Sequence, residues 1–193
     1  DKIIVLGRDM YDLIQNKVKW EPNKIQSIPN WGQVDQISPN PEAGKQFLDD
    51  IGLRGKFILL WAGNMGAPHD IECILDAARR LTGNPNIHFL FIGSGTKAEL
   101  VQKQIEDTKY SNITLLDPLP RSSQESFLNA CNIVLSSLIP NMYGISVPSR
   151  MYNIFAAGKP ILSIGNENSE LACVLREHQL GWNVTPSDSE GVV

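Results

Sequence analysis

The chain has 193 residues, of which 42% are hydrophobic and 20% are charged. These values place it among ordinary globular proteins, and the length allows a buried core without disulfides or a structural metal. The formal net charge is −4, and the lysines and arginines are dispersed along the chain. Because a basic stripe is missing, this composition argues against nucleic acid as a partner.

The first forty residues predict few elements. Strand patterns cover residues 3–6 and 25–28, a helical pattern covers 9–16, and a proline-containing loop follows up to Pro41. Two strands and one helix are too little for a core, so we expect residues 1–40 to be the tail of a preceding domain plus a linker. Since the chain starts inside a strand pattern and stops where a helix is starting, we expect it to be part of a longer protein.

From residue 41 onward apolar runs alternate with helical patterns, and we assign residues 41–193 to a second domain. This alternation predicts an α/β fold with a doubly wound, parallel, six-stranded Rossmann-like sheet, with Trp61 and Trp182 in its core. The predicted strands cover residues 57–61, 87–92, 112–116, 132–136, 160–164 and 182–184. The predicted helices cover residues 70–81, 97–109, 122–130, 148–157 and 169–178.

Local signals mark the ends of several helices. Asp70 can cap the first helix of the domain, and Ser122 with Glu125 matches a capping box. Gly158 and Gly181 are expected to end two of the helices.

The cysteines and the apolar runs limit the kind of protein. Cys73, Cys131 and Cys173 are far apart and form no CxxC pair, so we expect buried, reduced thiols and no metal site. The longest apolar runs, such as 57–62, are far shorter than the roughly 20 residues of a membrane span. We therefore expect a cytoplasmic protein.

The strongest chemical signal is a glycine-bearing loop, 141–147, that leads into a helix predicted to begin at Pro148. Proline suits the first helical position, and the free N–H groups and dipole of a helix start favour an anion. Arg150 adds a guanidinium whose donors match phosphate oxygens. These features predict a phosphate-binding site.

A second loop is expected at the same place. Residues 62–70 follow the first strand of the domain and carry Gly63 and Gly66, which let a backbone approach a ligand closely. If the strand order is 3-2-1-4-5-6, this loop and the loop 136–148 meet where the order reverses, the usual ligand site of such sheets. His69 lies in this loop, but the sequence shows no partner that would orient it for catalysis.

A competing signal points to NAD. Gly93 and Gly95 begin a match to G-x-G-x-x-A, and Asp117 ends the next strand, where a ribose-binding acid is expected. The pattern lies in the second βα unit, away from the expected crevice, so a plain turn is the favoured interpretation. An NAD-dependent oxidoreductase domain stays as an alternative.

In four segments the chain resembles the C-terminal, donor-binding domain of GT-B glycosyltransferases of the group 1 (family 4) class. The resemblance covers nearly the whole chain and is most specific in the last segment. The four segments are Lys24-Ile-Gln-Ser-Ile-Pro-Asn-Trp31, Leu60-Trp-Ala-Gly-Asn-Met-Gly66, Phe91-Ile-Gly-Ser-Gly95, and Gly144-Ile-Ser-Val-Pro-Ser-Arg150 with Ala156-Ala-Gly-Lys-Pro160.

The resemblance implies roles for individual residues. Asn153 would lie beside the ribose and Asn141 beside the donor sugar; both are amides where the family has glutamates, and an amide can bond hydroxyls but carries no charge. A non-catalytic nucleotide-sugar-binding module is therefore a further alternative. Asp117, Pro118 and Leu119 would lie beside the nucleotide base. The residues implied to hold the donor diphosphate are Gly63, Gly66, Ile145, Ser146, Val147, Ser149 and Arg150.

The implied reaction is transfer of a sugar from a nucleotide-diphosphate sugar, expected to be UDP-linked, to a glycan or lipid-linked acceptor. The resemblance implies retention of configuration and no metal or other cofactor. The acceptor, and any membrane contact, would belong to an N-terminal domain outside this chain.

Overall fold

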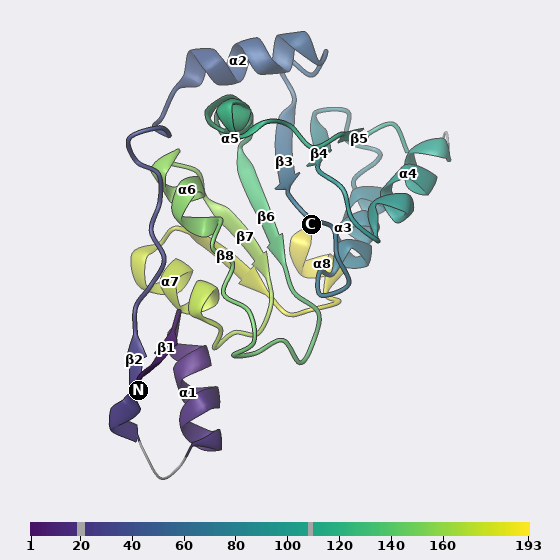
Figure 1. Ribbon diagram of the computed structural model, residues 1–193. Coiled ribbons are helices and arrows are strands. Elements are labelled where there is room, and N and C mark those ends of the chain that lie inside the picture. Colours follow the sequence, from purple (N-terminus) through teal and green to yellow (C-terminus); the bar gives the residue numbers. More distant parts are fainter. Residues whose placement is uncertain (19–21, 108–109) are drawn as a thin grey trace.

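The computed structural model describes residues 1–18, 22–107 and 110–193, and shows one two-stranded and one six-stranded sheet (Figure 1). The strands are β1 (Ile3–Val5), β2 (Ile25–Ser27), β3 (Phe57–Ala62), β4 (Ile87–Ile92), β5 (Ile113–Leu116), β6 (Ile133–Ser137), β7 (Ile161–Ile164) and β8 (Gly181–Val184). The helices are α1 (Arg8–Lys17), α2 (Pro41–Asp50), α3 (Ile71–Arg80), α4 (Ala98–Glu106), α5 (Gln124–Ala130), α6 (Met151–Ala156), α7 (Glu170–His178) and α8 (Ser189–Val192), with 3-10 turns η1 (Pro22–Lys24) and η2 (Arg121–Ser123).

The six-stranded sheet confirms the predicted fold class. Its order is β5-β4-β3-β6-β7-β8 and every neighbouring pair is parallel. Counted within the sheet, this is the order 3-2-1-4-5-6. The order reverses between β3 and β6, so the loops that follow these two strands diverge and leave a crevice at their carboxyl ends.

Helices cover both faces of this sheet. In β3, Ile58 and Leu60 face the cluster that includes α2, α5, α6 and α7, and the alternate residues Leu59 and Trp61 face α3, α4 and α8. Trp61 is in the core as predicted, with 1% of its surface exposed. The prediction for Trp182 is wrong: it is 57% exposed, because β8 is the edge strand.

Helix α2 was not predicted from the sequence. Asn40 caps it by accepting a hydrogen bond from the Ala43 N–H, and Pro41 occupies a first-turn position that suits proline. The helix packs on α5 so closely that a side chain at Gly44 would overlap the Asn129 carbonyl. Of the predicted helix 97–109, residues 108–109 lie outside the described residues.

The predicted caps have mixed outcomes. Asp70 caps α3 by accepting from the Cys73 N–H. The capping box is wrong: α5 begins at Gln124, and the Glu125 carboxylate instead accepts from the Ser38 N–H and hydroxyl. Gly158, with φ +68, follows α6 as expected, whereas α7 ends at a left-handed Gln179 rather than at Gly181, which starts β8.

Strands β1 and β2 pair in parallel in a small sheet of their own, and α1 packs on them. From β2, residues 28–40 run along the sheet domain to α2 at the opposite end of the molecule (Figure 1). The division into residues 1–40 and 41–193 remains a prediction.

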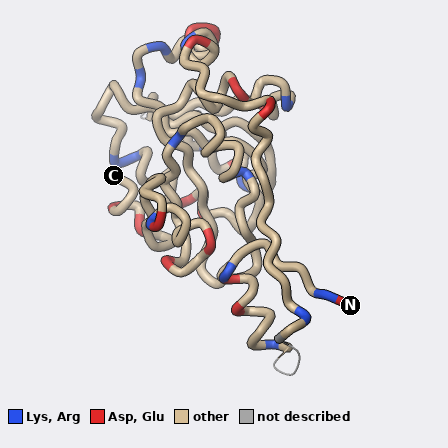
Figure 2. Tube along the Cα trace, turned by 90° about the vertical axis from the view of Figure 1, so that its left-hand side faces the viewer, with Lys and Arg blue, Asp and Glu red and all other residues tan. Residues whose placement is uncertain are grey.

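The distribution of charged side chains and the state of the cysteines can be compared with the expectations from composition. Acidic and basic side chains are interspersed along the trace (Figure 2). Cys73 and Cys131 are buried free thiols, whereas Cys173 is partly exposed, contrary to expectation. Within the described ranges no helix is long and apolar enough to span a bilayer.

Candidate functional site

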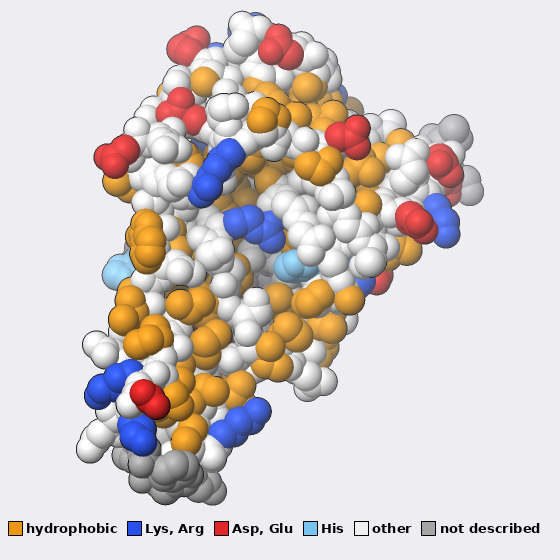
Figure 3. Space-filling view, in the orientation of Figure 1, with side chains coloured by type: hydrophobic (Ala, Val, Ile, Leu, Met, Phe, Trp, Pro, Cys, Tyr) orange, Lys and Arg blue, Asp and Glu red, His pale blue; other side chains and the backbone are white. Residues whose placement is uncertain are grey.

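A pocket of about 690 Å³ opens at the carboxyl ends of β3 and β6, where topology predicts a ligand site. In the space-filling view this face is hollowed at its centre, and basic side-chain atoms are visible in the hollow (Figure 3). The walls are formed by the loops after β3 and β4, the segment from β5 into α5, strand β6, the start of α6, and the linker before α2.

Two arginines, Arg121 and Arg150, line this pocket. Arg150 contacts the end of β3. Its Nη1 donates to the Ala62 carbonyl, and its guanidinium carbon lies 5.3 Å from the centre of the Trp61 ring. No carboxylate of the described residues lies within ion-pair distance of it. Burial lowers the pKa of Arg150, which reflects the cost of holding this charge away from water. A partly buried cation without an anion is complementary to an anionic ligand.

The helix that follows is shorter than the sequence predicted. Helix α6 has six residues and begins at Met151, with Arg150 at the N-cap position. Pro148 is therefore not the first helical residue; its carbonyl accepts from the Met151 N–H in a preceding turn. Since a short helix carries a small dipole, the Arg150 side chain supplies most of the positive charge.

Trp61 connects Arg150 to His69. The His69 ring meets the Trp61 ring edge-on, with 5.0 Å between their centres, and its Nδ1 lies 2.8 Å from the Ser137 carbonyl oxygen. That carbonyl requires a proton on Nδ1, which leaves Nε2 as an acceptor in the neutral ring. Burial, with the charges of Arg150 and Lys97, lowers the pKa of His69 and favours the neutral ring. Among the described residues, no carboxylate is bonded to the His69 ring.

Glycines allow the loops after β3 and β4 to pack in direct contact. Gly63 has φ +133, and a side chain there would overlap the Arg150 guanidinium. Gly93 has φ +143, and a side chain there would overlap the Gly63 carbonyl. The Met65 N–H donates to the Ser94 carbonyl over 2.7 Å. The glycine pair after β4 therefore serves contact between loops.

The structure brings about half of the predicted site residues into this pocket. Those that line it are Gly63, Pro118, Leu119, Ser149, Arg150 and Asn153. Those that do not line it are Gly66, Asp117, Asn141, Ile145, Ser146 and Val147.

The residues outside the pocket have different surroundings. Val147 packs in the core, Ile145 and Asp117 are exposed, and Gly66 is buried in its own loop. Asn141 lines a separate pocket of about 240 Å³ together with Ser169. Their roles in donor binding remain predictions.

The Asn153 side chain is engaged at both ends. Its Oδ1 accepts from the Gln33 N–H over 2.8 Å, and its Nδ2 donates to Gln124 Oε1 over 3.2 Å. Arg121 Nε in turn donates to Gln33 Oε1 over 3.1 Å. These bonds fix the linker along one wall of the pocket. The linker residues were not predicted as part of the site. The sequence feature that could have indicated them is Trp31, an aromatic residue in a loop of proline, asparagine and glycine.

Comparison with known proteins identifies the family. The family model described as "Glycosyl transferases group 1" matches residues 56–193. The chain belongs to the group 1 glycosyltransferases. It is 32% identical to glycosyltransferase WbjE of Pseudomonas aeruginosa over 97% of the chain and 46% of that protein. It is 25% identical to the colanic acid biosynthesis glycosyl transferase WcaI of Escherichia coli (strain K12) over 82% of the chain and 39% of that protein. The chain thus spans less than half the length of these curated relatives.

Solved structures of GT-B glycosyltransferases share the fold. WaaG, a glycosyltransferase involved in lipopolysaccharide biosynthesis, matches with a TM-score of 0.79 at 15% identity, over 99% of this chain and 51% of WaaG. A glycosyltransferase from Rickettsia africae matches with a TM-score of 0.81 at 16% identity, over 100% of this chain and 51% of that one. The family assignment argues against the NAD-dependent alternative. In agreement with it, Gly93 and Gly95 pack against the neighbouring loop, and Asp117 does not line the pocket.

Proposed function

We propose that this chain is the donor-binding half of a glycosyltransferase that moves a sugar from a UDP-linked donor to a glycan or lipid-linked acceptor. The observation that carries the proposal is Arg150, which faces the crevice without a carboxylate partner in the described part of the chain. A donor diphosphate would supply that negative charge, and the guanidinium offers it paired N–H donors.

Two structurally similar glycosyltransferases that were solved in complex with UDP support the choice of donor. HepE of Anabaena, with a TM-score of 0.78 at 16% identity over 99% of this chain and 51% of HepE, is solved with UDP and glucose. TarM of S. aureus, with a TM-score of 0.72 at 15% identity over 98% of this chain and 35% of TarM, is solved with UDP, alpha-GlcNAc-glycerol and Fondaparinux. These complexes favour a UDP-sugar donor and a glycan acceptor for the present protein.

The chemistry assigned to the pocket is stabilisation of the leaving group. The acceptor hydroxyl oxygen forms a bond to the anomeric carbon, the bond from that carbon to the diphosphate breaks, and its electron pair goes to the diphosphate. The proton of the hydroxyl passes to the departing diphosphate. Arg150 would stabilise the charge that develops there, which is the role of a fixed donor in electrostatic catalysis. We further propose retention of configuration, no metal or cofactor requirement, and cytoplasmic action, with the acceptor held by a preceding domain.

Binding and turnover of the intact protein test this function. Arg150→Ala should lower turnover with a UDP-sugar about 100-fold, or roughly 3 kcal/mol of barrier, with the fold intact. The control is Arg54→Ala, since Arg54 is exposed, pairs with Asp49 and lies outside the pocket. Unchanged kinetics of the Arg150 variant, or binding of NAD in place of UDP, would contradict the assignment. UDP-sugar binding without transfer or hydrolysis would instead support a non-catalytic binding module.

A further inference from the structure

The two ends of the main pocket differ in chemistry. One end is formed by Gly63, Ser149 and Arg150 and carries the unpaired guanidinium. The other end is walled by Pro118 and Leu119 after β5, by α5 and by the linker before α2, and it also carries the polar side chains of Arg121 and Gln124. The first end suits a diphosphate, and the second suits a flat group with apolar faces and polar edges.

The linker is held in place at the second end. The Gln33 N–H donates to Asn153 over 2.8 Å, and the Gln33 side chain accepts from Arg121. Gly32 lies so close to α6 that a Cβ there would be 2.8 Å from the Tyr152 carbonyl oxygen. A backbone held by side-chain bonds and by close contact presents its neighbouring side chains at fixed positions.

Trp31 is the side chain presented there. It lines the pocket, and 80% of its surface is exposed, the largest exposed fraction among the large hydrophobic residues of the described chain that lie at the surface. An indole face in water at the rim of a ligand pocket gains free energy when a flat apolar or aromatic group covers it. The described residues provide no such cover.

The order of residues along the pocket matches the order of groups in a nucleotide. Asn153 follows Arg150 by three residues, which places it one helical turn farther along α6. Gln33 is bonded to Asn153, and Trp31 lies two residues before Gln33. Diphosphate, ribose and base would therefore meet Arg150, Asn153 and Trp31 in turn.

We propose that Trp31 stacks on the base of the donor nucleotide and covers the outer end of the pocket. This inference rests on the proposed function, and it adds a nucleoside-binding residue outside the sheet domain's own loops. Base–aromatic stacking tolerates any base, so Trp31 contributes affinity for the nucleoside, and the pocket wall beside Pro118 and Leu119 would select among bases.

The test measures binding of two ligands to the intact protein by calorimetry: UDP, and inorganic pyrophosphate, which lacks the base and ribose. Trp31→Ala should weaken UDP binding about tenfold or more and leave pyrophosphate binding unchanged. Trp31→Phe should restore most of the UDP affinity. Trp182→Ala is the matched control, because Trp182 is also exposed, at 57%, but lies on β8 away from the pocket.

Three outcomes would overturn the stacking role. Equal UDP affinity in wild type and Trp31→Ala would exclude it. An equal loss for UDP and pyrophosphate would show that Trp31 only supports the pocket, and a rise in the KM of the acceptor alone would assign it to the acceptor. Arg150→Ala separates this inference from the proposed function: it should weaken both ligands, and if wild type binds neither, the proposed function fails as well.

Discussion

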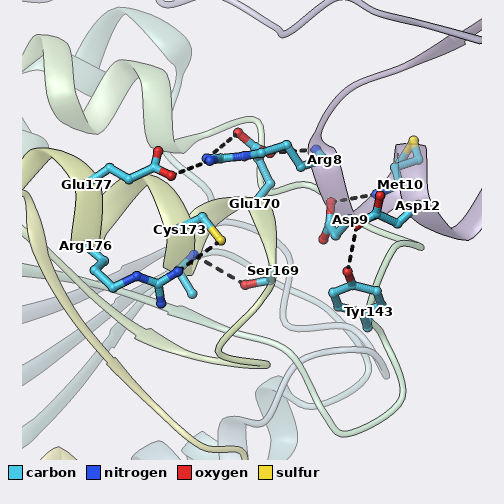
Figure 4. Close-up of polar contacts among 11 residues, drawn as sticks. Arg8, Asp9, Met10, Asp12, Tyr143, Ser169, Glu170, Cys173, Arg176 and Glu177 are labelled. Atoms are coloured by element: carbon cyan, nitrogen blue, oxygen red, sulfur yellow. Dashed lines mark hydrogen bonds and ion pairs between the residues drawn. The ribbon is translucent and has the colours of Figure 1, made fainter.

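Glu170, the first residue of α7, completes the amino end of α1 through Arg8 (Figure 4). Its Oε2 accepts from the Arg8 N–H over 2.7 Å and from Arg8 Nε over 3.0 Å. The N-cap of α1 is Gly7, which has no side chain to bond the free N–H groups, and a Cβ there would lie 2.7 Å from the Glu170 Cβ. The helix therefore receives its cap from a residue 162 positions later, and this contact anchors residues 1–28 on the sheet domain.

Removing this cap should loosen α1. Glu170→Ala is expected to cost about 1–2 kcal/mol of unfolding free energy, because a backbone N–H and a guanidinium lose the same acceptor. Urea denaturation gives the magnitude, and hydrogen exchange should show faster exchange of the α1 amides. Glu177→Ala is the control: it loses only an exposed ion pair to Arg8 and should change stability by less than about 1 kcal/mol. Equal effects of the two variants would exclude a capping role.

The unpaired charge of Arg150 predicts an unusual stability effect. Arg150→Met keeps an apolar stem and removes a partly buried cation, so the Tm of the ligand-free protein should stay the same or rise. The Tm increase caused by UDP should be lost in the same variant. Differential scanning calorimetry measures both values. A marked drop in the ligand-free Tm would assign Arg150 a structural role instead.

The contact between Gly93 and Gly63 predicts intolerance to the smallest side chain. Gly93→Ala places a methyl group on the Gly63 carbonyl at a φ of +143 and should cost about 3 kcal/mol of unfolding free energy. Gly83→Ala is the control, because a Cβ there meets open space and the change should stay within about 0.5 kcal/mol. Chemical denaturation compares the two; similar free energies would show that the loops can separate without cost.

The lowered pKa of His88 predicts that the free energy of unfolding decreases in mild acid. It is 6% exposed, its Nε2 lies 2.9 Å from the Thr114 hydroxyl oxygen, and burial, aided by the charge of Lys56, lowers its pKa from 6.5 to about 4. Between these values the unfolded chain binds a proton that the folded chain does not, so stability is full above pH 6.5 and falls toward pH 4. The contribution is roughly 3 kcal/mol at 1.36 kcal/mol per pKa unit.

Denaturation curves between pH 4 and 7 check this dependence. His88→Gln, which keeps a side-chain partner for Thr114, should flatten the acid limb of the stability profile. His178→Gln should not, because His178 is exposed at the end of α7. A wild-type profile with the same slope as that of His88→Gln would show that His88 does not control it.

The sequence predicted the sheet and the place of the crevice because both follow from local patterns. A run such as 57–61, apolar on both faces, is typical of a buried parallel strand, and alternation with helices leaves few topologies. Gly63 was predicted because it follows a strand at the edge where ligands bind, and Arg150 because it lies where a glycine-bearing loop leads into a helix.

The parts that sequence reasoning did not predict depend on distant contacts. Helix α2 packs on α5, and the bond from Gln33 to Asn153 joins residues 120 positions apart. The start of α6 moved from Pro148 to Met151 although proline favours a first helical turn. Nothing local to Trp31 indicates that tertiary bonds hold it at the rim of a pocket.

The central position of β3 has a consequence for nascent and shortened chains. Its two neighbours are β4 and β6, and the pairing of Leu59 with Ile133 cannot form until 74 more residues have left the ribosome. Until then one edge of β3, whose Ile58 and Leu60 are buried in the folded protein, has no partner. A nascent or shortened chain that stops between the two strands is therefore prone to self-association, and chaperone protection matters most during that interval of translation.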